Sequence, residues 1–188
     1  NGAYDAVADI VARYMGEISE LTGRSYRPFD YYGDPQAENV IVAMGSVTET
    51  IKETVDYLEQ QGRKVGVLIV RLYRPFSAKY FLKALPETVK KIAVLDRTKE
   101  PGSLGEPLYL DVKALFQGRE NAPLVIGGRY GLSSKDTTPA QIIAVYDNLE
   151  QKEPKTDFTI GIVDDVTFKS LPIKEEVSIV KPGTTECK

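Results

Sequence analysis

The feature that most constrains the fold of this chain is an alternation of short apolar runs with amphipathic stretches, which begins at residue 39. Asn39–Met44 (NVIVAM) and Val65–Val70 (VGVLIV) are continuous runs of the kind found in strands buried on both faces of a parallel sheet. The stretch between them carries apolar residues at helical spacing: Val47, Ile51, Val55 and Leu58.

The same alternation continues to residue 163. Apolar runs at 91–95, 124–126 and 158–163 are separated by predicted helices near 77–85, 107–117 and 138–149. Strands and helices in this order predict an α/β fold, with a three-layer, doubly wound, mostly parallel five-stranded sheet. Residues 158–163 are able to pair antiparallel at an edge of that sheet.

Two further segments flank this region, so we expect three parts: 1–38, 39–168 and 169–188. Residues 1–21 form a predicted helix with apolar side chains every three or four positions: Ala3, Val7, Ile10, Tyr14, Ile18 and Leu21. Residues 24–38 are too aromatic for a disordered spacer, and we expect their rings to pack on a surface. The chain starts at Asn1 inside the predicted helix, as a piece of a longer protein would.

Composition excludes several classes of chemistry. The chain has no histidine, which removes imidazole acid–base catalysis and histidine-ligated metals. Its single cysteine, Cys187, cannot build a disulfide framework, a four-cysteine zinc site or an iron–sulfur cluster, and it fits a reducing, intracellular setting. The formal net charge of −3 argues against nucleic acid as a partner. The sequence has no apolar run long enough to cross a membrane.

A strand followed by Gly45-Ser46 and a helix is the strongest local motif. A helix N-terminus presents free N–H groups that can hold a phosphate or a carboxylate, which makes Ser46 and Thr48 candidate anion ligands. The competing interpretation is a capping box between Ser46 and Glu49, and we favour it because this box is common.

Four arginines follow predicted parallel strands, at the edge where open α/β sheets bind ligands. Three explanations remain open: an anionic ligand, an acidic surface of a partner domain, or pairing with local carboxylates such as Asp96, Glu100 or Asp136. We favour an interface over a pocket at this edge. The four residues are Arg71, Arg74, Arg97 and Arg129.

Two adjacent acids, Asp164 and Asp165, follow the last strand, and a turn is favoured over a metal site because neighbouring side chains diverge. The sequence thus offers no residue that we predict to be catalytic or to bind a metal.

Three long strings carry a family resemblance: VAMGSVTETIKETVDYLEQQGRKVGVLIVRLYRPFS, LDRTKEPGSLGEPLYLDVKALF and TIGIVDDVT. With them the whole chain, 1–188, resembles domain II of pyruvate:ferredoxin (flavodoxin) oxidoreductases, and more widely the C-terminal domain of transketolase-like enzymes. In this resemblance, residues 1–38 are the exit from a preceding thiamine-type domain, and the tail leads toward a gamma-type domain.

The resemblance implies a cytoplasmic homodimeric parent enzyme of anaerobic metabolism that decarboxylates pyruvate oxidatively. Such an enzyme uses thiamine diphosphate with Mg²⁺, passes electrons through iron–sulfur clusters to ferredoxin or flavodoxin, and releases acetyl-coenzyme A. This sequence lacks the family's GDG…N diphosphate motif and its cluster cysteines. The resemblance therefore implies a structural, assembly role for this chain, with its partners among the other domains of the same polypeptide.

A second hypothesis is a free-standing module that binds an anion, such as the phosphates of coenzyme A. It would use Ser46, Thr48 and the strand-end arginines at the carboxyl edge of the sheet.

Overall fold

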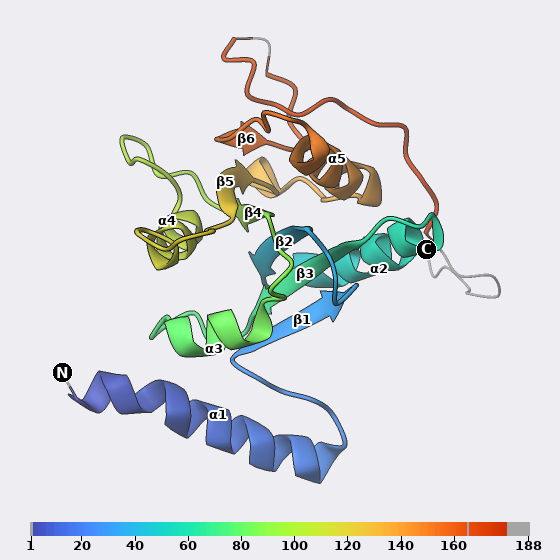
Figure 1. The fold of residues 1–188 in the computed structure, drawn as a ribbon. Helices are drawn as coiled ribbons and strands as arrows, with labels where there is room; N and C mark the ends of the chain where they lie inside the picture. The colour runs from blue at the N-terminus through green and yellow to red at the C-terminus, as the bar shows by residue number, and fades with distance from the viewer. Residues whose placement is uncertain (1, 165, 180–188) are drawn as a thin grey trace.

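The computed structural model describes residues 2–164 and 166–179. Its elements follow the predicted alternation of strands and helices from residue 39 onward (Figure 1). In chain order they are α1 (Gly2–Thr22), β1 (Phe29–Gly33), β2 (Asn39–Met44), α2 (Val47–Gln60), β3 (Val65–Val70), α3 (Ala78–Ala84), β4 (Lys91–Asp96), α4 (Pro107–Leu115), β5 (Leu124–Arg129), the short 3-10 helix η1 (Leu132–Ser134), α5 (Pro139–Glu150) and β6 (Phe158–Thr159).

One sheet of six strands runs through the molecule, in the order β1-β3-β2-β4-β5-β6. The four central strands are parallel, as the buried apolar runs predict. The expected number of five strands was wrong, because Phe29–Gly33 pairs antiparallel with β3 and adds an edge strand. Three of the four aromatic residues in this segment, Phe29, Tyr31 and Tyr32, are therefore part of the sheet.

The opposite edge of the sheet, at β6, also differs from the prediction. Residues 158–163 do not form an antiparallel strand: only Phe158–Thr159 is a strand, and it pairs parallel with Gly128 and Arg129. The Phe158 ring lies directly against the backbone of Gly128, so any side chain at position 128 would overlap this ring. Gly128 makes room for this buried ring, and the adjacent Gly127 does the same for the Tyr109 ring of α4.

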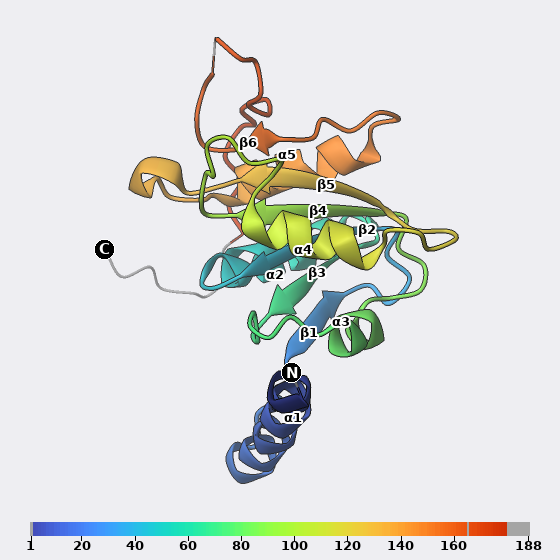
Figure 2. The ribbon, with the colours of Figure 1, turned by 90° about the vertical axis from the view of Figure 1, so that its left-hand side faces the viewer.

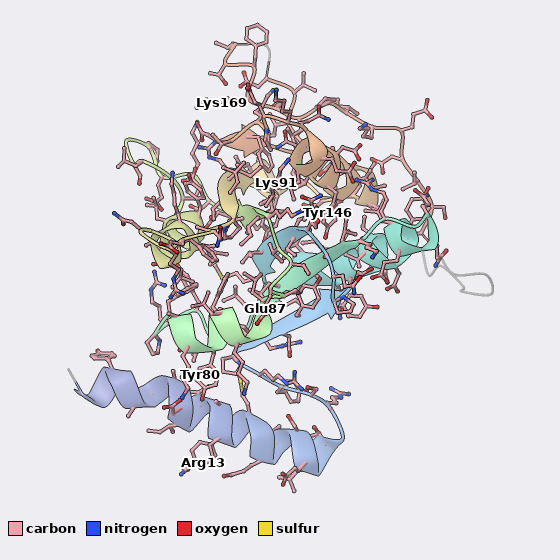
Figure 3. All side chains as sticks on the ribbon, viewed as in Figure 1. Arg13, Tyr80, Glu87, Lys91, Tyr146 and Lys169 are labelled. Atoms are coloured by element: carbon pink, nitrogen blue, oxygen red, sulfur yellow. The ribbon has the colours of Figure 1, made fainter. Side chains whose placement is uncertain are left out.

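Helices cover both faces of the sheet (Figure 2). Alternate residues of β2 enter different cores, as the two-residue repeat of a strand requires. Ile41 and Ala43 pack with α2 and α5, whereas Val40 and Val42 pack with α3 and α4. Tyr146 of α5 is fully buried in the first core, and its hydroxyl donates to the Gly66 carbonyl at 2.9 Å (Figure 3).

Helix α1 lies outside these layers and reaches the rest of the chain through polar contacts (Figures 1 and 2). Asp9 accepts hydrogen bonds from Lys79 Nζ at 2.7 Å and from the Tyr80 hydroxyl at 2.6 Å. The helix itself is as predicted, but most of its apolar stripe faces solvent. Exposed fractions range from 46% to 86% at four of the stripe residues: Ile10, Tyr14, Ile18 and Leu21.

The segment after β6 returns to the sheet. Ser170 forms a bridge with Thr159, and Leu171 is buried in the core beside α5. Cys187 lies outside the described residues. In the part of the chain that the structure describes, no helix is long and apolar enough to span a membrane.

Candidate functional site

The N-terminus of α2 borders a hollow of about 540 Å³ at the carboxyl ends of β2 and β3. Three of the predicted site residues meet there, because the two strands are parallel neighbours in the sheet. Met15 of α1 and Tyr26 form the outer wall. The three predicted residues in this hollow are Ser46, Thr48 and Arg71.

The donors at this helix start are mostly used within the chain. The Thr48 hydroxyl donates to the Gly45 carbonyl at 2.7 Å, and the Thr48 N–H bonds to the same oxygen. The predicted capping box was wrong: Ser46 is itself in a helical conformation and makes no side-chain cap, and Glu49 pairs with Lys52 at 2.6 Å. A helical Ser46 cannot aim its hydroxyl at the first-turn N–H groups in the usual way.

Arg71 also has a partner inside the chain. Its Nε donates to Asp30 Oδ2 on the antiparallel strand β1 at 2.7 Å, and its guanidinium faces the Tyr26 ring. Asp30 lies in the segment that the sequence suggested was a linker, so this pairing depends on the unexpected edge strand. An anion entering the hollow would have to compete with the Asp30 carboxylate for Arg71.

Arg74 and Arg97 occupy different surroundings. Arg74 stacks on the Tyr73 ring at 3.8 Å and pairs with Asp111 of α4 at 2.8 Å. Arg97 is exposed and lies against Gly131, where a Cβ atom would be 3.0 Å from its Nε. Among the described residues, Arg97 forms no ion pair.

Arg129 is the most buried of the four arginines, with 12% of its side chain exposed. It bridges two carboxylates: Glu106, which is 5% exposed at the start of α4, and Asp157 just before β6. Asp157 also pairs with Lys169. This chain of four charges ties α4, β5 and the tail segment together, which is a structural role.

The topological switch point of the sheet lies between β2 and β4, where doubly wound folds place ligands. Tyr130 follows β5 and is 7% exposed, and its hydroxyl reaches the Met44 carbonyl at the end of β2 at 3.4 Å. Burial raises the pKa of this phenol. The side chain therefore occupies the place that a ligand would take.

Asp96 is a residue whose role the sequence did not show. It ends β4 and is 3% exposed, and its two oxygens accept the N–H groups of Leu108 and Tyr109 at 3.0 and 3.1 Å. Burial raises the pKa of Asp96, and these two bonds oppose the shift. The sequence did contain a pattern that indicates this role: an acidic residue ends a buried strand, and the next helix begins with a proline.

The carboxylates that pair with the arginines thus differ from the suggested Asp96, Glu100 and Asp136. Each observed partner lies far along the chain from its arginine, whereas the suggestion considered nearby acids.

At the last turn, Asp164 accepts hydrogen bonds from the Thr167 hydroxyl and from the N–H groups of Val166 and Thr167. The Thr167 hydroxyl is the main reason that the pKa of Asp164 falls to about 2. Asp165 lies outside the described residues, and among those that are described no cluster of acids and cysteines could hold a metal ion.

Comparison with known proteins adds independent findings. Residues 37–142 match the family model described as pyruvate:ferredoxin oxidoreductase core domain II. The chain is 56% identical over its full length to the pyruvate-flavodoxin oxidoreductase of Enterobacter agglomerans and to the pyruvate:ferredoxin oxidoreductase of Moorella thermoacetica. It spans 16% of the length of each of these two relatives.

Solved structures show weaker likeness. A 2-oxoglutarate:ferredoxin oxidoreductase from Magnetococcus marinus aligns with a TM-score of 0.46 and 20% identity, over 66% of this chain and 20% of that one. A split-gene transketolase aligns with a TM-score of 0.45 and 16% identity, over 68% of this chain and 40% of that one.

Proposed function

Because the chain belongs to the pyruvate:ferredoxin oxidoreductase core domain II family, we propose that it is a non-catalytic assembly domain of such an enzyme. The whole enzyme oxidises pyruvate to acetyl-coenzyme A in the cytoplasm. It works as a homodimer on thiamine diphosphate and Mg²⁺, with iron–sulfur clusters that pass electrons to ferredoxin or flavodoxin. These groups bind to other domains of the polypeptide.

One observation carries this proposal: three of the four arginines at the carboxyl edge of the sheet are committed to carboxylates within the chain, and Arg97 is the exception among the described residues. Arg71, Arg74 and Arg129 pair with Asp30, Asp111 and Glu106 respectively. The switch-point crevice is filled by a tyrosine. Electrostatic groups that already satisfy one another hold a scaffold in shape but leave little to bind a substrate.

The exposed stripe of α1 supports an assembly role. Four large apolar side chains at intervals of three and four residues cover one face of a 21-residue helix. A soluble protein seldom leaves such a stripe in water, because burying each side chain is favourable by about 1.5–3 kcal/mol. In this proposal residues 1–38 provide the contact to the preceding domain through α1, although their strand β1 belongs to the sheet. Residues 39–168 are the scaffold, and 169–188 lead onward after Leu171 has packed in the core.

Ligand titration of the 188-residue chain tests the non-catalytic role. Adding thiamine diphosphate with Mg²⁺, or coenzyme A, leaves its melting temperature unchanged. A saturable rise in melting temperature at micromolar ligand contradicts the proposal, because site-specific binding stabilises the folded state by mass action.

Substitution in the α1 stripe tests the assembly role. Ile18→Asp leaves the melting temperature of the 188-residue chain unchanged, because this side chain is 48% exposed, and it destabilises the full-length enzyme. Glu20→Ala, an exposed change on the same helix, is the matched control. Equal melting temperatures of full-length Ile18→Asp and wild-type enzymes would argue against a docking face on α1.

The alternative function is anion binding, such as that of the coenzyme A phosphates, in the hollow at α2. The observation that favours it is that Ser46, Thr48 and Arg71 do line one hollow. Calorimetry with coenzyme A separates the two functions: binding here produces heat that Arg71→Ala removes and that salt weakens. An absence of heat eliminates this alternative.

A further inference from the structure

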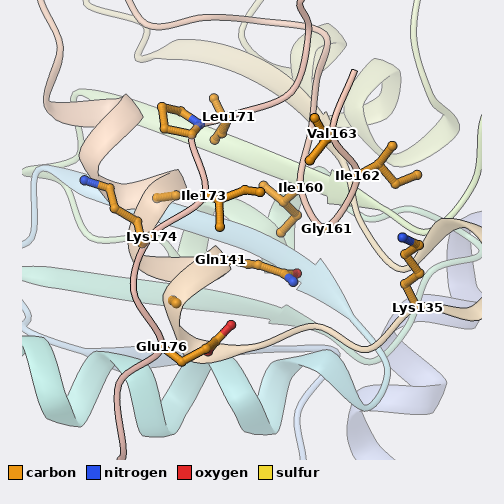
Figure 4. Close-up of a pocket in the computed structure, with 13 residues that line it drawn as sticks. Lys135, Gln141, Ile160, Gly161, Ile162, Val163, Leu171, Ile173, Lys174 and Glu176 are labelled. Carbon is orange, nitrogen blue, oxygen red and sulfur yellow. The ribbon is translucent and has the colours of Figure 1, made fainter. Parts of the chain in front are cut away.

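A second hollow, of about 410 Å³, lies beside the N-terminal half of α5, where the segment after β6 crosses the helix (Figure 4). Its volume falls within the range of about 300–1,000 Å³ that is typical of ligand sites. Small residues of α5, Ala140 and Ala144, line it together with apolar side chains of the crossing segments: Ile160, Ile162, Val163, Leu171 and Ile173.

A polar group without a partner lies in this apolar hollow. Gln141 Oε1 is buried and has no hydrogen-bond partner among the described residues. The Gln141 amide is drawn between Ile160, Gly161 and Lys135 in Figure 4. Gly161 adopts a φ of +78°, and a Cβ atom there would lie 3.1 Å from Gln141 Oε1, so the glycine leaves room for the amide. A buried acceptor without a donor is costly, so a donor that reaches Gln141 Oε1 would bind there favourably.

The charged groups around the hollow differ in whether they have partners. Lys174 pairs with Asp147 at 2.8 Å, and Glu176 accepts a bond from the Thr138 hydroxyl at 2.9 Å. Lys135 is exposed and forms no ion pair with any described residue. One positive charge is therefore left for a partner.

The apolar surface extends beyond the hollow. Large side chains on the segments that cross α5 and on the neighbouring turn are 62% to 86% exposed: Val163, Val166, Phe168 and Ile173. A small ligand in the hollow would contact Val163 and Ile173, which line it, and would leave Val166 and Phe168 in water. A protein segment is long enough to cover the hollow and the exposed side chains near it, and exposed apolar surface of this kind marks protein interfaces.

We propose that this surface receives an extended peptide segment from another part of the same enzyme polypeptide. One apolar side chain of the segment enters the hollow, a backbone N–H donates to Gln141 Oε1, and an acidic side chain pairs with Lys135. The source follows from the relatives, of which this chain spans only 16%, so most of a comparable polypeptide lies outside it. The inference rests on the proposed assembly function.

Hydroxyl-radical footprinting of the full-length enzyme and of the 188-residue chain tests the proposal. In the isolated chain, Phe168 and Ile173 are oxidised as exposed side chains. In the full-length enzyme, their oxidation falls to the level of Ile142, which is fully buried and serves as the internal standard. Equal oxidation of Phe168 and Ile173 in both proteins overturns the proposal.

Two substitutions test the chemistry of recognition. In the full-length enzyme, Gln141→Leu and Lys135→Glu each restore oxidation of Ile173 toward the rate in the isolated chain. Gln117→Leu and Lys152→Glu, which change exposed residues elsewhere, leave the protection intact. Protection that survives both test substitutions refutes the peptide contacts proposed here.

A folding defect is separated from loss of docking in the isolated chain. There, Gln141→Leu keeps or raises the melting temperature, because it removes a buried acceptor that has no donor. A lower melting temperature would show that Gln141 is bonded within the chain and would contradict the inference.

The footprint of α1 distinguishes this inference from the assembly function on which it rests. Protection of Ile18 in the full-length enzyme, with Ile173 still oxidised, refutes the second docking surface alone. Oxidation of both side chains at the isolated-chain rate refutes both.

Discussion

Replacing Arg129 with methionine removes the charge at the centre of the network that joins α4, β5 and β6. Methionine keeps an unbranched side chain of similar reach, so packing changes less than electrostatics do. The substitution leaves the Glu106 side chain, which is only 5% exposed, without its cation. Asp157 is 40% exposed and keeps its ion pair with Lys169, so the substitution removes less stabilisation from Asp157 than from Glu106.

The expected cost follows from the burial of Glu106. Breaking a buried ion pair by removing one partner costs about 3–5 kcal/mol, since an uncompensated charge stays in the interior. The lower end, about 3 kcal/mol, applies because Arg129 retains 12% exposure and water can approach. For a chain of this size, each kcal/mol lowers the melting temperature by about 2–4 °C, which gives a decrease of roughly 6–12 °C.

Thermal unfolding followed by circular dichroism, supported by urea titration, measures this decrease. The double variant Arg129→Met/Glu106→Gln recovers part of the loss, because no charge is then left buried. Lys90→Met is the control: its pair with Glu38 is exposed on both sides, and such pairs contribute at most about 1 kcal/mol. A decrease for Arg129→Met no larger than that for Lys90→Met would refute the argument.

Three further outcomes are expected. Asp96→Asn destabilises the fold by about 1–3 kcal/mol in urea titration, because an amide can accept only one of the two N–H groups at the start of α4; an unchanged midpoint would show that water replaces the lost acceptor. Gly128→Ala costs about 1–3 kcal/mol through overlap with the buried Phe158 ring, and a crystal structure of the variant should show β6 displaced. The hydrogen bond to Asp56, together with burial, raises the pKa of Tyr32 from 10 to about 12. The folded state therefore holds this proton more tightly than the unfolded chain, and its contribution to stability is complete below pH 10 and lost as the pH rises through 12; melting curves of Tyr32→Phe should lack this component of the alkaline decline, and identical pH profiles would count against it.

The repeating part of the fold could be predicted because it follows from local physics. A β-branched run such as Val65–Val70 can bury both faces only in the middle of a sheet, and short connections to helices make parallel order the natural arrangement. The two edges were predicted less well. Phe29–Gly33 looks like a linker, and it is a strand because β3 offers an unpaired edge with matching register. At the other edge, Gly128 of β5 admits the Phe158 ring, and only two residues of β6 pair with β5.

The candidate site shows the same division. The positions of Arg71 and Arg129 at strand ends were evident from spacing, but their carboxylate partners come from β1 and α4, which no local pattern connects to them. Likewise, helical periodicity identified the α1 stripe without indicating whether it faces the core or solvent.

The sequence alone determined that helices cover a sheet and that the central strands run parallel. Its composition also excluded histidine chemistry, and cysteine chemistry other than that of Cys187. Those properties depend on neighbours along the chain or on residue type. Only the tertiary structure decided which charges neutralise one another, which crevice Tyr130 fills and which apolar side chains stay in water. Such contacts join residues far apart in sequence, and their energies depend on distance and burial, which exist only once the chain has folded.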